Sequence, residues 1–417
     1  MGWVTEYHPT TDELNACVQC GLCLPACPTF RLTGRETASP RGRIQAMKAV
    51  HNGILQVDQP FQGVIDFCLG CRACEPVCPG MVPYGRALEG ARAEIAAQRP
   101  GFSHRARSVL LGRVIGSRGS LRAGSAALRA AQSTGATSLA PTRLRRLAAG
   151  LRPLQGRPRA TVGHSGGSGE SGKVALLAGC IQDEWFRPVN HAAIALLEMA
   201  GYRVEVPAGQ TCCGALAAHD GKADAARALA RRNMPVFTGY DQVVVTSAGC
   251  SAHVREYGHW APAGEQVGER AVDVTVVVAR AIEIGLLPRL RVGSGPIAVQ
   301  DPCHLRHAQR VTAEPRSILQ AGGFDVVEID PAGMCCGAAG LYSVLQPEAS
   351  TELGNRKATQ IRSTGVTRVA SANPGCEMQL RSALGARYEI AHPIEWYLRG
   401  VMAADESGRV AGVRTAR

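Results

Sequence analysis

The sequence has no run of about 18 uninterrupted apolar residues, the length that a membrane-spanning helix needs. The nearest stretch, residues 272–287, is interrupted by Asp273, Arg280 and Glu283. The N-terminus lacks the basic stretch followed by an apolar one that marks a secretory signal peptide. Glu6 stands where N-myristoylation requires serine or threonine. These absences predict a cytoplasmic protein without a membrane span.

Nucleotide-binding signatures are also missing. No G-x-G-x-x-G follows an expected strand, so nothing in the sequence indicates that this chain itself binds FAD or NAD. The stretch GSGESGKV at 167–174 resembles a phosphate-binding loop, but Val174 replaces the required serine or threonine. Aromatic residues make up only 5% of the chain and no nucleic-acid-binding motif is present, which argues against nucleic acid as a partner.

The net charge of +12 comes from one segment. Between Gly101 and Lys173 there are twelve arginines and one lysine against one acidic residue, Glu170, and the rest of the chain is balanced. Three interpretations stay open for this segment: a docking face for acidic partner subunits, a patch that contacts an anionic membrane surface peripherally, and a solvated linker.

Cysteine, in contrast, is abundant: the chain has 16. Disulfides are rare in the cytoplasm, so this number indicates metal or redox chemistry. The runs CVQCGLCLPACP at 17–28 and CLGCRACEPVCP at 68–79 both spell C-x2-C-x2-C-x3-C-P. This spacing is typical of two [4Fe–4S] clusters in which the fourth cysteine of each run serves the other cluster. Structural zinc is the alternative, although zinc would leave a cysteine of each run surplus.

The expected ligands follow from that exchange. One cluster is assigned Cys17, Cys20, Cys23 and Cys78, and the other Cys68, Cys71, Cys74 and Cys27.

We divide the chain into five segments, which together predict an α+β multidomain protein. Residues 1–100 are expected to form a helical ferredoxin-type domain, and 101–172 a basic segment that begins with amphipathic helices and ends in a flexible glycine- and serine-rich linker. Alternating strand and helix patterns predict α/β domains at 173–290 and 291–402. Buried strands are expected at 173–179, 202–206, 242–247, 296–301, 324–329 and 367–372, and the expected helices include 84–98 and 347–363. Residues 403–417 are expected to be a disordered tail.

The two α/β segments contain matching cysteine sets, which indicates an internal duplication. In each set a lone cysteine ends an expected strand, a Cys-Cys-Gly follows 32 positions later, and a last cysteine comes 37 or 40 positions after the pair. Adjacent thiols make poor disulfides with one another but can face a single metal centre. The candidate ligands are Cys180, Cys212, Cys213 and Cys250 in one set, and Cys303, Cys335, Cys336 and Cys376 in the other.

These sets resemble the CCG domains of the heterodisulfide reductases, which hold non-cubane iron–sulfur clusters. In that family each set ends in C-x-x-C, whereas this sequence has Ser247 or Asn373 at the earlier of the two positions. One soft ligand per set is therefore missing. A cubane cluster, a zinc ion and a site without metal all stay open for these cysteines.

Residues 10–400 resemble the iron–sulfur subunits of bacterial glycolate oxidase (glycolate dehydrogenase). The resemblance rests on both cysteine runs, on SPRGRI after the first of them, and on VALLAGCIQ, CCGALAAH, DPCHLRHAQ, CCGAAGLYSVLQPE and NPGC. It implies a helical ferredoxin domain followed by two CCG domains. It also implies partner subunits that bind FAD and oxidise the 2-hydroxy acid.

The sequence thus predicts an electron-transfer subunit that passes electrons from the partner's FAD toward a quinone or another respiratory acceptor, without a substrate-oxidising site of its own. The alternatives are the corresponding subunit of anaerobic glycerol-3-phosphate dehydrogenase or of lactate utilisation, a thiol- or disulfide-reducing enzyme, and a zinc-stabilised scaffold. His219, His304 and His307, with Asp301, are candidates for tuning a nearby cysteine site or for capping and core contacts.

Overall fold

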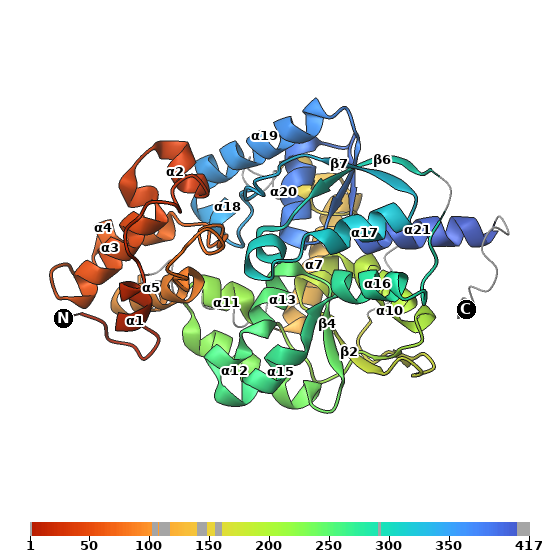
Figure 1. Cartoon of the computed structure of the whole chain (residues 1–417), viewed down its shortest axis with the longest axis horizontal. Helices are drawn as coiled ribbons and strands as arrows, with labels where there is room; N and C mark the ends of the chain where they lie inside the picture. Colours follow the sequence, from red (N-terminus) through yellow and green to blue (C-terminus); the bar gives the residue numbers. More distant parts are fainter. Residues whose placement is uncertain are drawn as a thin grey trace.

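The structure is a computed structural model that describes residues 2–101, 107, 117–139, 148–154, 161–290 and 293–406. A helical N-terminal domain lies at one end, and two α/β halves make up the rest (Figure 1). Each half is built on one sheet whose strands are mostly parallel. This arrangement confirms the predicted fold class.

The N-terminal domain consists of short helices joined by cysteine-containing loops. Ser39 is the N-cap of the helix at 40–51: its side chain accepts a hydrogen bond from the Gly42 N–H, and Pro40 occupies the first helical turn. The last helix spans the predicted residues 84–98. The elements are α1 (Thr11–Asn15), α2 (Pro28–Thr33), η1 (Glu36–Ala38), α3 (Pro40–His51), α4 (Gln59–Asp66) and α5 (Tyr84–Gln98).

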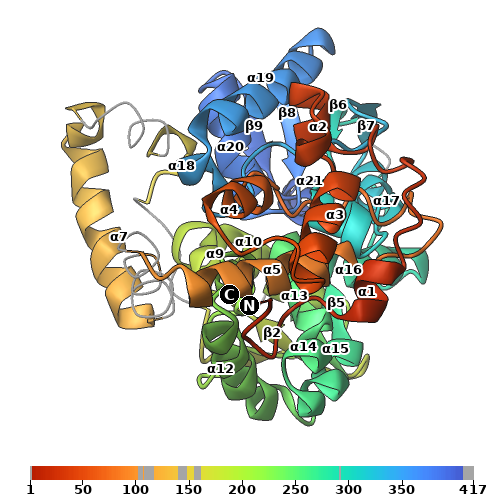
Figure 2. The same cartoon turned by 90° about the vertical axis from the view of Figure 1, so that its left-hand side faces the viewer.

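Within the basic segment, the described residues include the predicted amphipathic helix, α7 (Arg118–Ser133), followed by η3 (Ala136–Leu139). This helix stands to one side of the other helices in Figure 2. The prediction of a flexible linker at 163–172 is wrong, because β1 (Ser165–Gly166) pairs antiparallel with β3 (Arg203–Glu205). Ser171 adds a hydrogen bond to the Ala200 carbonyl at 2.6 Å.

The first α/β half has the strand order β1-β3-β2-β4-β5. Buried valine, alanine and leucine residues make its central strands, as parallel strands covered on both faces require. Its elements after β1 are β2 (Lys173–Leu177), α9 (Ile181–Trp185), α10 (Arg187–Met199), β3, α11 (Ala215–His219), α12 (Ala223–Asn233), η4 (Met234–Phe237), β4 (Gln242–Val245), α13 (Ala248–Arg255), α14 (Tyr257–Trp260), η5 (Pro262–Gly264), α15 (Glu265–Arg270), β5 (Ala271–Asp273) and α16 (Val274–Glu283).

The second α/β half repeats this topology in the strand order β7-β6-β8-β9, with all pairs parallel. Its elements are β6 (Gly295–Gln300), the π-helical turn η6 (His304–Ala308), α17 (Ala313–Ala321), β7 (Phe324–Glu328), α18 (Tyr342–Leu345), α19 (Pro347–Ser363), β8 (Arg368–Ser371), α20 (Pro374–Leu384), β9 (Glu389–Ala391) and α21 (Pro393–Glu406). The equivalent strand positions in the two halves confirm the duplication inferred from the cysteine spacing.

The two halves share a hydrophobic core. Ile318, Ile394 and Tyr397 of the second half are buried among the residues of α10 and α16 of the first half. The last helix, α21, reaches Glu406, so residues 403–406 of the expected disordered tail are helical, and 407–417 lie outside the described residues. Among the described residues there is no helix long and apolar enough to cross a membrane.

Candidate metal centres

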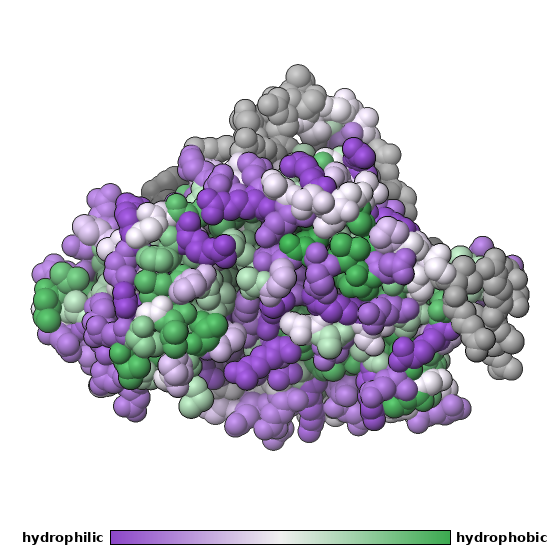
Figure 3. All heavy atoms as spheres, turned by 45° about the horizontal axis from the view of Figure 1, so that its top comes forward, coloured by the Kyte–Doolittle hydropathy of each residue, from purple (hydrophilic) through white to green (hydrophobic). Residues whose placement is uncertain are grey.

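The first predicted ligand set, named the outer set here, lies near the surface of the N-terminal domain. It consists of Cys17, Cys20, Cys23 and Cys78, of which Cys20 is exposed and the other three are partly buried. Exposed apolar side chains flank these cysteines at Val18, Leu22, Val77 and Met81. Figure 3 shows apolar side chains at the surface of this end of the molecule. A cluster held here is accessible to another protein.

The other predicted ligand set, the inner set, is buried. It consists of Cys68, Cys71 and Cys74 in the loop between α4 and α5, with Cys27 at the N-terminus of α2. Polar groups reach two of its sulfurs. Tyr84 Oη donates to Cys68 Sγ at 3.5 Å, the Gly70 N–H donates to the same sulfur at 3.4 Å, and Thr29 Oγ1 lies 3.3 Å from Cys27 Sγ.

The structure places the two runs so that their fourth cysteines can be exchanged. Besides burial, neighbouring thiols raise the pKa of Cys74 and of Cys23, and Cys27 is among them in both cases, so Cys27 lies within reach of both runs. At the other end, Gly80 packs against the first run: a Cβ there would lie 2.3 Å from the Ala16 carbonyl oxygen. That close approach brings Cys78 to the outer set and supports the proposed exchange.

The chemistry of the inner donor set fits an iron–sulfur cluster. Burial raises the pKa of the Cys74 thiol well above its ordinary value, and the neighbouring Cys71 and Cys68 raise it further. Burial also acts to raise the pKa of Cys68, but the charges of Arg43 and Arg92 and the two hydrogen bonds to its sulfur outweigh burial and lower it. A metal centre would stabilise the thiolate form of all four cysteines, including Cys74, whose surroundings alone disfavour it.

In the α/β halves, the candidate cysteines lie at the carboxyl ends of the strands. Cys180 follows β2, and Cys250 lies in the first turn of α13 after β4. The pair after β3 completes this first paired-cysteine set. Cys180 Sγ lies 3.3 Å from Cys212 Sγ, and Cys213 Sγ lies 3.1 Å from Cys250 Sγ. Ligand sites in open α/β sheets are found at this edge.

The second paired-cysteine set occupies the equivalent positions after β6, β7 and β8, namely Cys303, Cys335, Cys336 and Cys376. All eight paired-set cysteines line one cavity of about 1100 Å³ between the two halves, and Cys68 of the inner set also lines it. The cavity wall is otherwise largely apolar, with contributions from Leu121, Trp185, Leu216 and Leu341 among others. Among the described residues, no three His, Cys, Asp or Glu side chains converge closely enough to hold a single metal ion.

Ser247 and Asn373, which replace the missing cysteines, contact each other. Ser247 Oγ donates to Asn373 Oδ1 at 3.1 Å, and the Gly249 N–H donates to the same oxygen at 3.2 Å. The Asn373 amide donates to Cys376 Sγ at 3.6 Å. Each position thus takes part in the contact between the halves, and Asn373 also supplies a hydrogen bond to a candidate ligand.

The histidine candidates separate into two groups. His304 Nδ1 lies 3.6 Å from Cys303 Sγ, and its ring stacks on His219 with centroids 5.2 Å apart. His219 in turn bonds Glu89 of α5 at 2.8 Å. These residues join the N-terminal domain to both halves beside the cysteine sites.

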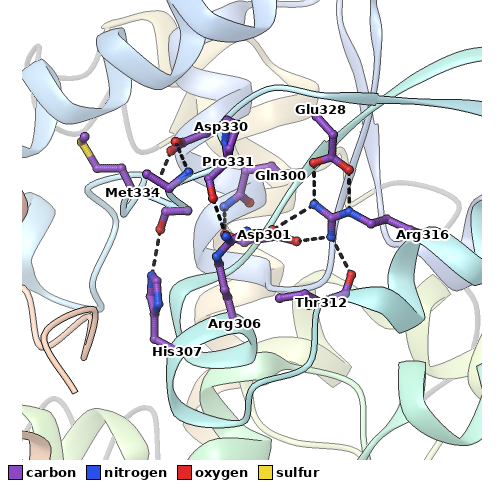
Figure 4. A network of polar contacts seen from close by, with 12 residues as sticks. Gln300, Asp301, Arg306, His307, Thr312, Arg316, Glu328, Asp330, Pro331 and Met334 are labelled. Atoms are coloured by element: carbon purple, nitrogen blue, oxygen red, sulfur yellow. Dashed lines mark hydrogen bonds and ion pairs between the residues drawn. The ribbon is translucent and has the colours of Figure 1, made fainter. Parts of the chain in front are cut away.

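His307 and Asp301 have structural roles instead (Figure 4). His307 Nε2 bonds the Gly333 carbonyl at 2.9 Å, and Asp301 accepts hydrogen bonds from Arg306 and Arg316 at 2.7 and 2.9 Å. Arg306 also donates to the Pro331 carbonyl. This network fixes the turn that carries Cys303 against the loop that leads to Cys335 and Cys336.

The inner set adjoins the second paired-cysteine set. The pKa of Cys71 is raised chiefly by burial and next by Cys303, so these two thiols lie close together. Leu69, Cys71 and Ala73 pack in one buried cluster with Cys335 and other residues of the second half. The Tyr342 hydroxyl donates to the Phe67 carbonyl at 3.3 Å and closes the same contact.

Two largely buried arginines beside the cysteine sites could not be recognised from motifs. Arg43 reaches the inner set, yet the sequence identified SPRGRI only as a family feature. Arg152 binds Glu377, the neighbour of Cys376, but it is one of twelve arginines in the basic segment and nothing local distinguishes it.

The fold and the cysteine sites define an iron–sulfur protein that joins a two-cluster domain to a pair of cysteine-rich domains. Comparison with protein families agrees with this class. A 4Fe-4S dicluster domain matches residues 13–82, and a cysteine-rich domain of the CCG type matches residues 174–255 and 297–381.

Comparison with curated proteins identifies the family more narrowly. A probable glycolate oxidase iron-sulfur subunit of Bacillus subtilis is 32% identical over 99% of this chain and 97% of its own length. The glycolate oxidase iron-sulfur subunit of Escherichia coli is 31% identical over 92% of this chain and 93% of its own length. The chain therefore belongs to the family of glycolate oxidase iron–sulfur subunits. Lactate utilization protein A of Bacillus subtilis is 26% identical over 52% of this chain and 93% of its own length.

Proposed function

We propose that this chain is the electron-transfer subunit of a flavin-dependent dehydrogenase that oxidises glycolate or a related 2-hydroxy acid. FAD and the substrate site are on partner subunits. Two [4Fe–4S] clusters, when bound, supply one-electron carriers at the outer and inner sets. The observation that carries the proposal is a continuous series of thiol sites: exposed Cys20, then the buried inner set, then Cys303 beside Cys71.

We infer the direction of electron transfer from the positions of the outer set and the second paired-cysteine set. The outer set faces the surface among exposed apolar side chains, so a donor protein reaches the chain there. The second paired-cysteine set faces the large cavity, so a small acceptor reaches the chain through it. An apolar wall with a few polar groups suits a quinone, which we propose as the acceptor.

Lactate is the second candidate substrate, because a lactate utilization protein shares half of this chain. The partner subunits decide between the two acids, since this chain carries the electron path and not the oxidation site. For the basic segment, residues 101–172, we propose that its arginines contact either an acidic partner subunit or an anionic membrane surface.

The test begins with anaerobic purification of the full chain and measurement of iron, sulfide and zinc. About eight irons per chain, together with two paramagnetic signals after reduction by dithionite, are expected for the two clusters. Iron beyond that amount assigns metal to the α/β halves. The chain alone is expected to show no glycolate or lactate oxidation, and addition of the co-purifying flavoprotein is expected to restore it.

Two results would contradict the proposal. A colourless, zinc-rich protein without those signals would show that the cysteine sites hold structural zinc and not iron–sulfur clusters. Oxidation of glycolate by the isolated chain would place the substrate site on it.

A further inference from the structure

Arg43 is a fully buried arginine whose charge has no acidic partner. It lies on α3 and is 0% exposed. Its Nε donates to the Val64 carbonyl at 2.9 Å, and its Nη2 donates to Thr29 Oγ1 at 3.1 Å. Its Nη1 is buried and has no hydrogen-bond partner among the described residues.

A buried cation of this kind is costly unless an anion compensates it. Burial alone would lower the pKa of Arg43, but Cys68, Tyr84 and Cys27 outweigh burial and raise it. Apart from the Val64 carbonyl, the groups that bind or stabilise this guanidinium belong to the inner set or touch it. Four thiolates around a [4Fe–4S] core leave a net negative charge, which supplies the missing anion.

We propose that Arg43 is a positioning residue whose buried charge raises the reduction potential of a cluster held by the inner set. The cation stabilises the reduced cluster, which is the more negative of its two forms, more than the oxidised cluster. With clusters at both sets, a higher inner potential would favour transfer of one electron from the outer set to the inner set, with no bond formed or broken. This inference rests on the proposed function, because it requires clusters at both sets.

Thr29 sets the distance between Arg43 and a ligand of the inner set. Thr29 Oγ1 lies between Arg43 and Cys27, 3.1 Å from Nη2 and 3.3 Å from Sγ. The hydroxyl accepts from the guanidinium and donates its proton to the Ala38 carbonyl at 2.7 Å. The cation is therefore held one side chain away from the Cys27 sulfur.

Arg41, two residues earlier on the same helix, provides a natural contrast. It lies near the outer set and donates to the Gln19 carbonyl at 3.1 Å. Its side chain is 30% exposed, and Glu36 pairs with it at 2.8 Å, so solvent and a carboxylate already compensate its charge. Removing Arg41 should therefore change the potential of a neighbouring cluster much less than removing Arg43 does.

The experiment compares Arg43→Gln, Arg43→Lys and Arg41→Gln with the unaltered chain. Iron content is measured first, and the paramagnetic signal of each cluster is then followed during an anaerobic redox titration. Arg43→Gln is expected to lower the inner potential by about 59 mV or more, a tenfold change in the electron-transfer equilibrium constant. Arg43→Lys should recover at least half of that shift, and Arg41→Gln should leave the inner potential unchanged.

The possible outcomes are distinct. Equal potentials in Arg43→Gln and the unaltered chain would overturn the inference while leaving both clusters in place. Loss of the inner cluster's iron in both the Gln and Lys variants would show that Arg43 only ties α3 to its neighbours, and would overturn it too. Failure of the proposed function would be seen separately, as a lack of two cluster signals in the unaltered chain.

Discussion

Cys27 is four positions from Cys23 in sequence, yet the two cysteines belong to different candidate centres. The proline after Cys27 begins α2, Cys27 occupies the N-cap position of that helix, and it is among the thiols that raise the pKa of Cys74. Under the exchange of fourth ligands that we propose, neither run completes its centre alone. The two loops are then coupled through their ligands as well as through their packing.

This coupling predicts the effect of single cysteine substitutions. Cys27→Ser should alter the same paramagnetic signal as Cys71→Ser, whereas Cys78→Ser should alter the same signal as Cys17→Ser. Each variant should lose about half of the iron of the N-terminal domain, because one ligand of one centre is removed. If Cys27→Ser instead altered the signal that Cys17→Ser alters, the exchange would be wrong.

For individual residues, the sequence identified the candidate ligands but not the side chains that surround them. The eight N-terminal cysteines were identified by spacing, which is a local property of the chain. Arg43 was not identified, because its significance depends on Thr29, Val64 and Cys68, which meet only in the folded domain. A buried cation cannot be distinguished from a surface one by spacing alone.

Helix α21 shows how one element depends on a histidine that must stay neutral. His392 Nδ1 accepts the Ile394 N–H at 3.3 Å at the start of the helix. Burial lowers the pKa of His392 to about 3, and Glu395 only partly opposes that shift. The folded protein therefore favours the uncharged ring more strongly than the unfolded chain, whose His392 has the ordinary pKa of 6.5.

The sign of the resulting pH dependence is clear. Because the pKa of His392 is lowered in the folded state, its contribution to stability is complete above 6.5, the pKa in the unfolded chain. That contribution is lost as the pH falls toward about 3, the pKa in the folded protein. As the pH falls from about 7.5 to about 5.5, the neutral His392 ring should account for a loss of about 1 kcal/mol in the free energy of unfolding. His392→Asn keeps an acceptor for the Ile394 N–H and does not titrate. Its anaerobic urea-unfolding midpoint should fall less over this range, and equal slopes would contradict the prediction.

The longer elements were the most predictable. The segments 84–98 and 347–363 are helices over the predicted residues, because both have high helix propensity and clear ends. The short strands β1, β5 and β9 were missed, since two or three residues carry no period that a sequence can reveal. The glycine- and serine-rich stretch at 163–172 was misread because its pairing with β3 is a tertiary contact.

Across the whole molecule, Arg152 joins three parts of the chain. It comes from the basic segment, lies over the Phe186 ring of the first half at 5.2 Å, and binds Glu377 and Glu395 of the second half at 2.6 and 2.7 Å. Its side chain is largely buried, so solvent does little to weaken these pairs. At least this residue of the basic segment is part of the folded core.

Arg152→Met should therefore lower the free energy of unfolding by about 3–5 kcal/mol, because buried Glu395 loses its cation and buried Glu377 keeps only its pair with Arg381. Arg280→Met provides the matched control: its pair with Glu283 is exposed, and its loss should cost at most about 0.5 kcal/mol. Adding Glu377→Gln and Glu395→Gln to Arg152→Met should recover part of the loss. Similar urea midpoints for the Arg152 and Arg280 variants would refute this account.

The duplication itself could be predicted from cysteine spacing, and the structure confirms it. The sequence could not show that both paired-cysteine sets face one cavity, or that Cys303 lies beside Cys71. Those facts depend on how three domains pack together, and no local pattern encodes that packing.

The contact between Ser247 and Asn373 has a consequence for how this duplicated protein has diverged. The two positions are equivalent, but a hydroxyl meets an amide there: the Asn373 oxygen accepts both the Ser247 hydroxyl and the Gly249 N–H. Two identical halves would place the same side chain on both sides of this contact. The two copies have therefore diverged at a point where they touch, and the contact between them is no longer symmetric.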